Sequence, residues 1–144
     1  MLIGINDFSK NGNASADQVI AAMKDGVARL RAKWPQVRVI GATVVTALGS
    51  SSAAHGFPEQ DVKRKALNEF IRTSGTFDGV IDFDKTTLDP ATGSLKAEFV
   101  PESTTGGPGD KLHPNRTGYL AMGQAIDLDL FKPGRANRSA QGRQ

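Results

Sequence analysis

Asp110 and His113 form a pair of side chains whose types and spacing suit acid–base chemistry. They are three residues apart, so a short turn can bring the carboxylate against the imidazole Nδ1–H while Nε2 faces outward. A carboxylate in that position fixes the tautomer of the ring and stabilises the imidazolium, as an acid–base histidine requires. The same spacing is typical of a plain surface turn in which Asp110 caps nearby backbone groups. The spacing alone leaves both interpretations open.

The segment Gly4-Ile5-Asn6-Asp7 is a second candidate for chemistry, because it follows a short apolar stretch that reads as the end of a buried strand. A side-chain amide at Asn6, just past a strand end, can donate to an oxygen on which negative charge develops. An asparagine there is also suited to supporting the backbone of a turn. A strand that starts so close to its own end predicts that further strands are missing upstream of Met1.

Apolar residues at helical spacing predict three helices that position these segments. The first follows a candidate N-cap at Ser15, ends at Pro35, and has its stripe at Val19, Met23, Val27, Leu30 and Trp34. The second begins at Pro58, is closed by Gly75, and is expected to bury Val62, Ala66 and Phe70, with Leu67 and Ile71 as further candidates. The third follows Pro114, with one face formed by Tyr119, Met122, Ile126 and Leu130.

Two buried strands are predicted between these helices. Residues 37–46 are β-branched and nearly continuously apolar, as in a parallel strand covered on both faces, and residues 79–84 form a shorter run of the same kind. Residues 47–57 and 85–109 are predicted loops. Alternating strands and helices indicate an α/β layered fold with right-handed crossovers. In such sheets ligands bind at the carboxyl ends of the strands, where both candidate segments are expected to lie.

Together the two segments resemble the SGNH, or GDSL-type, serine hydrolases. Gly4-x-Asn6-Asp7 is similar to the G-x-N-D block that supplies the oxyanion-hole asparagine of that family, with Gly4 and Asp7 supporting the turn. Asp110-x-x-His113 is similar to the D-x-x-H block that supplies the acid and base of its triad. The sequence between the two blocks also looks like that of bacterial members of the family, and the resemblance extends to about Phe131.

The resemblance implies a truncated flavodoxin-like three-layer α/β sandwich with a short parallel sheet. It assigns residues 1–131 to one hydrolase-like domain whose N-terminal strands are missing. Residues 132–144 are then a basic and flexible tail. All 15 acidic residues precede this tail, which holds four Lys and Arg residues and no acid.

The expected nucleophile is absent from the sequence. The G-D-S block of the family, which carries the nucleophilic serine, precedes the G-x-N-D block, and no Gly-Asp-Ser occurs in this chain. Ser50, Ser51 and Ser52, which lie near His55 in the loop after the central strand, are possible surrogates, and Ser9 is a weaker one. The opposing interpretation is a small-residue loop in which no serine pairs with His113, and this is the one we predict.

The resemblance therefore implies a carboxylic ester hydrolase that works by acyl transfer, with His113 as base and acid, Asp110 orienting it and Asn6 as oxyanion donor. The nucleophile is then a non-family serine or a water activated by His113. The alternative is a catalytically inactive or weakly active truncated fragment of such an enzyme. A small-molecule ester is the expected substrate, and no cofactor is expected.

The composition excludes several other classes of protein. The chain has 144 residues, a length typical of one domain, and it has no cysteine, which excludes disulfides, a thiol nucleophile and cysteine-ligated metal sites. With only two histidines, no metal site is expected. No stretch is long and apolar enough for a membrane span, and the start of the chain does not look like a signal peptide. Because the net charge of +3 comes from the tail, nucleic acid is not an expected partner. The sequence does not predict a cellular compartment.

A homo-oligomer is predicted from the shortness of the sheet. If strands are missing, residues 37–46 would present unpaired backbone groups at an open edge. Such an edge favours the addition of a strand from a second copy.

Overall fold

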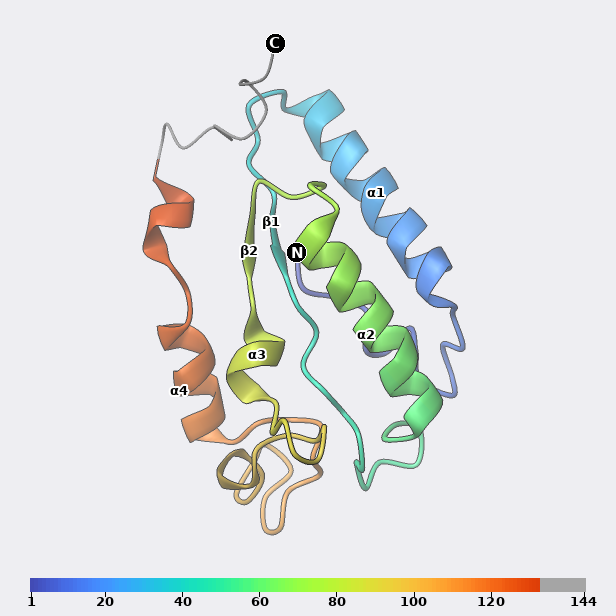
Figure 1. Ribbon diagram of the computed structural model, residues 1–144, viewed down its shortest axis with the longest axis vertical. Helices are drawn as coiled ribbons and strands as arrows, with labels where there is room; N and C mark the ends of the chain where they lie inside the picture. Colours follow the sequence, from blue (N-terminus) through green and yellow to red (C-terminus); the bar gives the residue numbers. More distant parts are fainter. Residues whose placement is uncertain (133–144) are drawn as a thin grey trace.

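The structure is a computed structural model that describes residues 1–132 (Figure 1). Apart from Lys132, the predicted tail lies outside the described residues. Within residues 1–132 the helices are α1 (Ala16–Lys33), α2 (Pro58–Thr73), α3 (Phe83–Thr87) and α4 (Arg116–Gln124), and the strands are β1 (Ile40–Ala42) and β2 (Gly79–Ile81). Short 3₁₀ turns occupy Ala97–Phe99 and Leu128–Phe131. The mixed helix and strand architecture with a short parallel sheet confirms the predicted α/β fold class.

The sheet is built on β1, which has backbone partners on both sides. On one side β2 is parallel to it, with Ile40 opposite Gly79 and Ala42 opposite Ile81. On the other side the N–H of Ala42 donates to the carbonyl of Met1 (2.9 Å), and the amino group of Met1 donates to Ile40. The edge predicted to be open along residues 37–46 is therefore partly occupied, because Met1 bonds to it at Ile40 and Ala42.

The central strand is also shorter than the predicted 37–46. Beyond Ala42, the backbone groups of Val44 are bonded by side chains of α2 and no longer by a neighbouring strand. The Val44 N–H donates to Asn68 Oδ1 (2.7 Å), and its carbonyl accepts from Asn68 Nδ2 (2.9 Å) and from Arg64 (3.0 Å). Regular pairing ends at this point for that reason, although the chain remains extended and buried.

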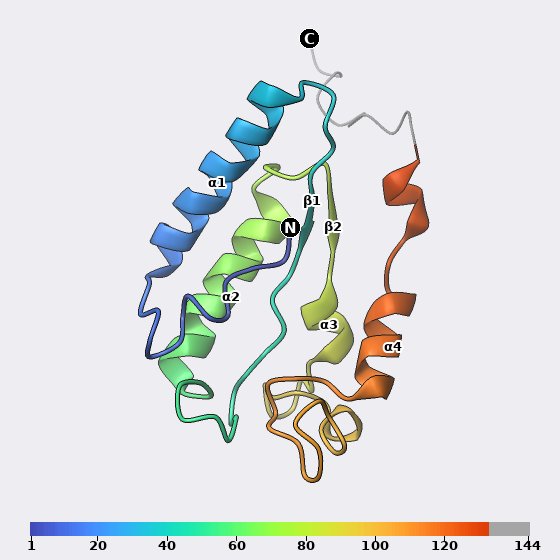
Figure 2. The ribbon, with the colours of Figure 1, turned by 180° about the vertical axis from the view of Figure 1, so that it is seen from behind.

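Helices cover both faces of the sheet, which gives three layers (Figures 1 and 2). One face packs against α1 and α2 in a core of Phe8, Val19, Met23, Val27, Val39, Val44, Leu67, Ile71 and Phe77. The other face packs against the α4 region in a smaller core of Ala42, Ile81, Phe83 and Met122. Neighbouring residues of the central strand belong to opposite cores, as the alternation of side chains along a strand requires.

Helix α1 follows its sequence signals closely. Ser15 caps its N-terminus with a complete capping box, in which Ser15 Oγ accepts from the Gln18 N–H and the Gln18 side chain accepts in return. The helix ends before Trp34, and this residue is 52% exposed. The prediction that Trp34 continues the buried stripe is wrong, because the chain leaves the helical path at that residue.

Helix α2 is rotated relative to its predicted face. Val62 is 67% exposed and Ala66 is also exposed, whereas Leu67 and Ile71 are buried. Four polar side chains share the buried face with these two, namely Gln60, Asp61, Arg64 and Asn68. The prediction is wrong for Val62 and Ala66, because polar side chains take their place. Gln60, Arg64 and Asn68 bond to other parts of the fold, whereas Asp61 pairs with Arg64 and Lys65 on the helix itself.

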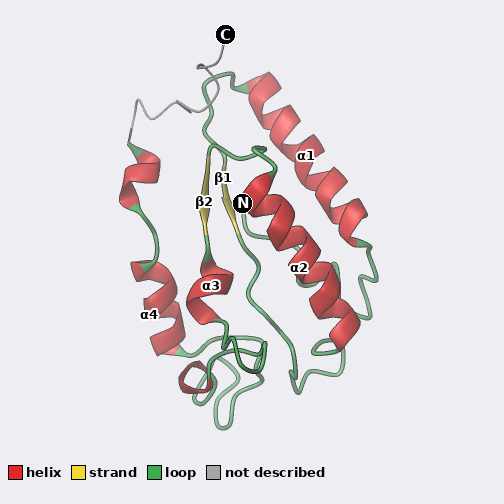
Figure 3. Cartoon of the chain, in the orientation of Figure 1, coloured by secondary structure: helices red, strands yellow, loops and turns green. Residues whose placement is uncertain are grey.

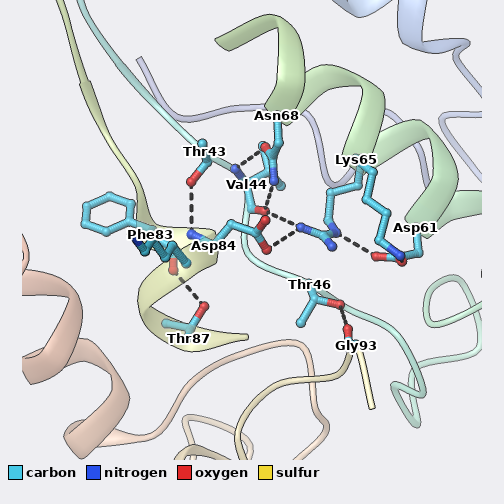
Figure 4. A network of polar contacts seen from close by, with 12 residues as sticks. Thr43, Val44, Thr46, Asp61, Lys65, Asn68, Phe83, Asp84, Thr87 and Gly93 are labelled. Carbon is cyan, nitrogen blue, oxygen red and sulfur yellow. Dashed lines mark hydrogen bonds and ion pairs between the residues drawn. The ribbon is translucent and has the colours of Figure 1, made fainter. Parts of the chain in front are cut away.

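Arg64 is at the centre of that polar cluster and is 1% exposed. Its guanidinium is paired with Asp61 (2.7 Å) and Asp84, while its Nη2 has no hydrogen-bond partner among the described residues. Figure 4 shows Asn68 bonded to the backbone of Val44, and the N–H of Asp84 bonded to the hydroxyl of the preceding residue, Thr43. The buried charges therefore connect α2 with α3 and the central strand.

The segment between β2 and α4 carries more structure than the predicted loop 85–109. It holds the end of α3 and the turn Ala97–Phe99, and its remaining loops gather at one end of the molecule beside the start of α4 (Figure 3). On α4, Met122 is buried, but Tyr119 is 45% exposed, so only part of the predicted face packs. None of the described helices is long and apolar enough to cross a membrane.

Candidate active site

The turn from Asp110 to His113 is held by the carboxylate of Asp110. Asp110 Oδ1 accepts from the backbone N–H groups of Leu112 and His113, both at 2.9 Å. Its Oδ2 lies 2.7 Å from His113 Nδ1, and the backbone of Lys111 adopts a left-handed conformation (φ +57°) that brings the two side chains together. A hydrogen on Nδ1 leaves Nε2 as the free acceptor of the ring.

The same contacts tune the charge of the pair. Partial burial opposes ionisation of Asp110, but hydrogen bonds from the His113 N–H, the His113 ring and the Leu112 N–H outweigh it and lower the pKa of the Asp110 carboxyl. The carboxylate side chain is 13% exposed, whereas the His113 side chain is 48% exposed. The pair is therefore a fixed anion that holds an accessible imidazole.

The Gly4–Asp7 turn depends on glycine at its first position. Gly4 has φ +129°, and a Cβ there would lie 2.7 Å from the Leu67 side chain. The carbonyl of Asn6 accepts from both the N–H (3.1 Å) and the Oγ (2.6 Å) of Ser9, which fixes the backbone. The Asn6 side chain is exposed and has no hydrogen bond to any other described residue. Its amide is thus available to a ligand.

An apolar pocket of about 210 Å³ lies between these two turns. Ile5, the neighbour of Asn6, lines one part of it, and Leu112 and Pro114, the neighbours of His113, line another. The full lining consists of Leu2, Ile3, Ile5, Val44, Val45, Leu112, Pro114, Tyr119 and Met122. The structure therefore brings both sequence-predicted segments to the rim of one apolar cavity.

The loop of surrogate serines lies beside the dyad and is bonded to the backbone of Asp110. Ser50 Oγ donates to the carbonyl of Asp110 (2.7 Å) and accepts from the N–H of Ser52 (3.1 Å). The N–H of Ser51 also donates to the Asp110 carbonyl (3.1 Å). Among the described residues, no serine hydroxyl is hydrogen-bonded to the ring of His113, and Ser9 is engaged with Asn6.

Gln60 is a buried polar residue at the site that sequence reasoning missed. It is 1% exposed, and its amide contacts His55, Gly56 and Ile5. The signal available in the sequence was weak, since a glutamine in the first turn of a helix is ordinarily solvent-exposed. Its partners come from two other segments, so only the fold reveals them.

A comparison with known families identifies the family of the chain. The model of the GDSL-like lipase/acylhydrolase family matches residues 1–121, a range that includes both turns. The chain therefore belongs to this family, and its general function is that of an acylhydrolase. The search of curated proteins returned no match for this chain.

Proposed function

We propose that the chain hydrolyses carboxylic esters, with Asp110 and His113 as its acid–base pair and Asn6 as an oxyanion donor. The observation that supports this best is the apolar pocket, whose lining includes the neighbours of both His113 and Asn6. In this proposal an acyl group held there presents its carbonyl to the unprotonated ring nitrogen of His113 and to the free side-chain amide of Asn6. In this proposal residues 1–131 act as one hydrolase domain.

The nucleophile in this proposal is water, because the hydroxyl of Ser50 is already committed to a backbone carbonyl. His113 Nε2 takes a proton from the water as its oxygen attacks the ester carbonyl, and the Asn6 amide donates to the resulting oxyanion. The tetrahedral intermediate then expels the alkoxide, which takes the proton from the imidazolium. The products are a carboxylic acid and an alcohol, and His113 returns to its neutral form.

General acid–base catalysis by a positioned side chain contributes about 10²–10⁴-fold, which is less than a complete nucleophilic triad provides. The Ser50 hydroxyl is bonded to a backbone carbonyl and is not paired with His113. This observation favours the second candidate function, a weakly active or inactive member of the family. The two candidates differ in whether His113-dependent hydrolysis is measurable.

The test is hydrolysis of p-nitrophenyl butyrate by the wild-type chain and by His113→Ala. We expect slow turnover that falls to the uncatalysed rate in His113→Ala. Asp25→Asn, which changes an exposed ion pair on α1, is the matched control and should retain full activity. Equal rates in wild type and His113→Ala would contradict the proposal, and a rate no greater than that of buffer would favour the inactive member.

A further inference from the structure

The loop between β1 and α2 connects the two turns of the candidate site. At one end Ser50 and Ser51 donate to the carbonyl of Asp110, as described above. At the other end the carbonyl of Ala54 accepts from the N–H of Lys10 (3.0 Å), just beyond the Asn6 turn. His55 follows Ala54 directly. The loop therefore carries an imidazole to the region between the oxyanion donor and the dyad.

Gln60 fixes the protonation state of that imidazole. Its Oε1 accepts from the N–H of Gly56 (2.9 Å), which identifies the other amide atom as nitrogen. The Nε2 of Gln60 donates to the carbonyl of Ile5 (3.1 Å) and lies 2.8 Å from Nδ1 of His55. A donor facing Nδ1 requires that nitrogen to be an unprotonated acceptor, so the ring hydrogen must reside on Nε2.

The surroundings of His55 also favour its neutral form. Partial burial and the charge of His113 lower the pKa of His55, and the Asp110 carboxylate only partly offsets them. These are the titratable groups that act on the ring, and both belong to the candidate acid–base pair. Nε2 of His55 has no hydrogen-bond partner among the described residues. The ring thus presents one fixed and unused N–H donor beside the dyad.

We propose that His55 is a further ligand-binding residue of this site, whose Nε2–H donates to the carbonyl oxygen of a bound acyl group. The inference rests on the proposed ester hydrolysis for the identity of the ligand, and on the Gln60 contacts for the state of the ring. A neutral donor suits this role because a carbonyl oxygen gains negative charge during attack, so the hydrogen bond strengthens in the transition state. Gln60 is then the positioning residue that keeps the donor on the correct nitrogen.

The first measurement is the tautomer of His55 in solution, by ¹⁵N NMR of the full chain labelled at histidine. We expect His55 at neutral pH to carry its hydrogen on Nε2 in the wild type, and to show mixed tautomers in Gln60→Met. Gln36→Met, an exposed substitution before β1, is the matched control and should leave the tautomer unchanged. A wild-type His55 protonated on Nδ1 would overturn the proposal whether or not the chain is an esterase.

The second measurement is the response of His55 to butyrate, which is the acid product of the test ester. Titration with butyrate should shift the Nε2–H resonance of His55, and His55→Phe should weaken butyrate binding about fivefold to tenfold, the value of one neutral hydrogen bond. His55→Gln, which retains an N–H donor, should recover part of the affinity. In hydrolysis, His55→Phe should lower kcat more than it raises KM.

These readouts separate the two proposals. One outcome is that the wild type hydrolyses no ester while butyrate still shifts the His55 resonance and binds more weakly to His55→Phe. In that case the hydrolysis proposal fails and the assignment of His55 as a donor stands. If hydrolysis depends on His113 while His55→Phe leaves butyrate affinity and kcat within twofold of wild type, the His55 proposal is overturned. Equal loss in His55→Phe and His55→Gln would also contradict it, because a purely structural role predicts no rescue by the donor.

Discussion

At Asp110 a single carboxylate holds both a backbone turn and an imidazole. One oxygen accepts from two N–H groups, and the other contacts His113 Nδ1. In Asp110→Asn the amide oxygen can still hold the turn, but the amide nitrogen then faces Nδ1 and favours the opposite tautomer. We expect ester hydrolysis to fall by about 10²-fold or more while the circular dichroism spectrum stays unchanged. Retained activity in this variant would show that the carboxylate does not orient the ring.

The pH dependence of hydrolysis follows from the charge of the same pair. The lowered pKa of the Asp110 carboxyl keeps it ionised throughout the neutral range. Protonation of Asp110 should therefore begin to lower the rate only below about pH 4, the usual value of an aspartate. The check is the ¹³C NMR titration of the Asp110 carboxyl together with the profile of kcat/KM against pH. A carboxyl that titrates at or above the usual value of an aspartate would contradict this prediction.

Residues whose partners lie within one turn could be predicted from sequence, whereas those with distant partners could not. The Asp110–His113 contact needs only its own four residues, so the spacing together with the family resemblance was enough to expect it. The tautomer of His55 depends on Gln60, and the orientation of Gln60 depends in turn on Ile5. Sequence spacing carries no information about such a chain of hydrogen bonds between separate segments.

At the scale of elements, the same reasoning explains the rotation of α2. Its apolar stripe at Val62 and Ala66 predicts burial, yet Arg64 and Asn68 are buried instead because they satisfy the backbone at Val44. The hydrogen bonds that compensate for their burial are made to another element, so helical periodicity within α2 cannot reveal them. The parallel pairing and the helix order, which depend on patterns within each segment, could be predicted.

Arg64 should be the most sensitive position of α2 to substitution. In Arg64→Met the carboxylates of Asp61 and Asp84, both buried, lose their principal buried cation. Removing one partner of a buried ion pair costs about 3–5 kcal/mol, and urea denaturation should show a loss of that size in the free energy of unfolding. Lys65→Met is the matched control, since Lys65 contacts Asp61 from a 61% exposed position and should cost no more than about 1 kcal/mol. Similar losses in both variants would contradict this prediction.

The start of α3 predicts a sensitivity to acid. Partial burial raises the pKa of Asp82, but hydrogen bonds outweigh it and lower this pKa to about 2. The donors are the Arg72 side chain, the Lys85 N–H and the Thr43 hydroxyl. A carboxyl with a lowered folded-state pKa stabilises the fold above its unfolded value of about 3.9, and this contribution is lost as pH falls through the folded value. The free energy of unfolding should therefore decline between about pH 4 and pH 2, and decline less steeply in Asp82→Asn. Parallel curves for the two proteins would rule out this role for Asp82.

At the scale of the whole molecule, self-association remains a prediction, but its expected location moves to the start of the chain. Leu2 and Ile3 are 48% and 49% exposed, and their backbone groups have no backbone hydrogen bond to the other described residues. We expect light scattering at micromolar concentration to show a dimer or larger species that Ile3→Lys shifts to monomer. Val62→Lys, at an exposed apolar position on α2, is the control and should not change the mass. A monomeric wild type would contradict the prediction.

The loop between β1 and α2 also has a thermal consequence. Its segment from Ser50 to Ala54 joins the Asp110 turn to the Asn6 turn through hydrogen bonds and contributes no residue to either apolar core. A loop held mainly by such bonds can open at a lower free energy than the core, and the two turns then separate although each keeps its own shape. On warming, the chain should lose the assembled site before it melts, so its working temperature is set by this loop and the melting temperature by the core.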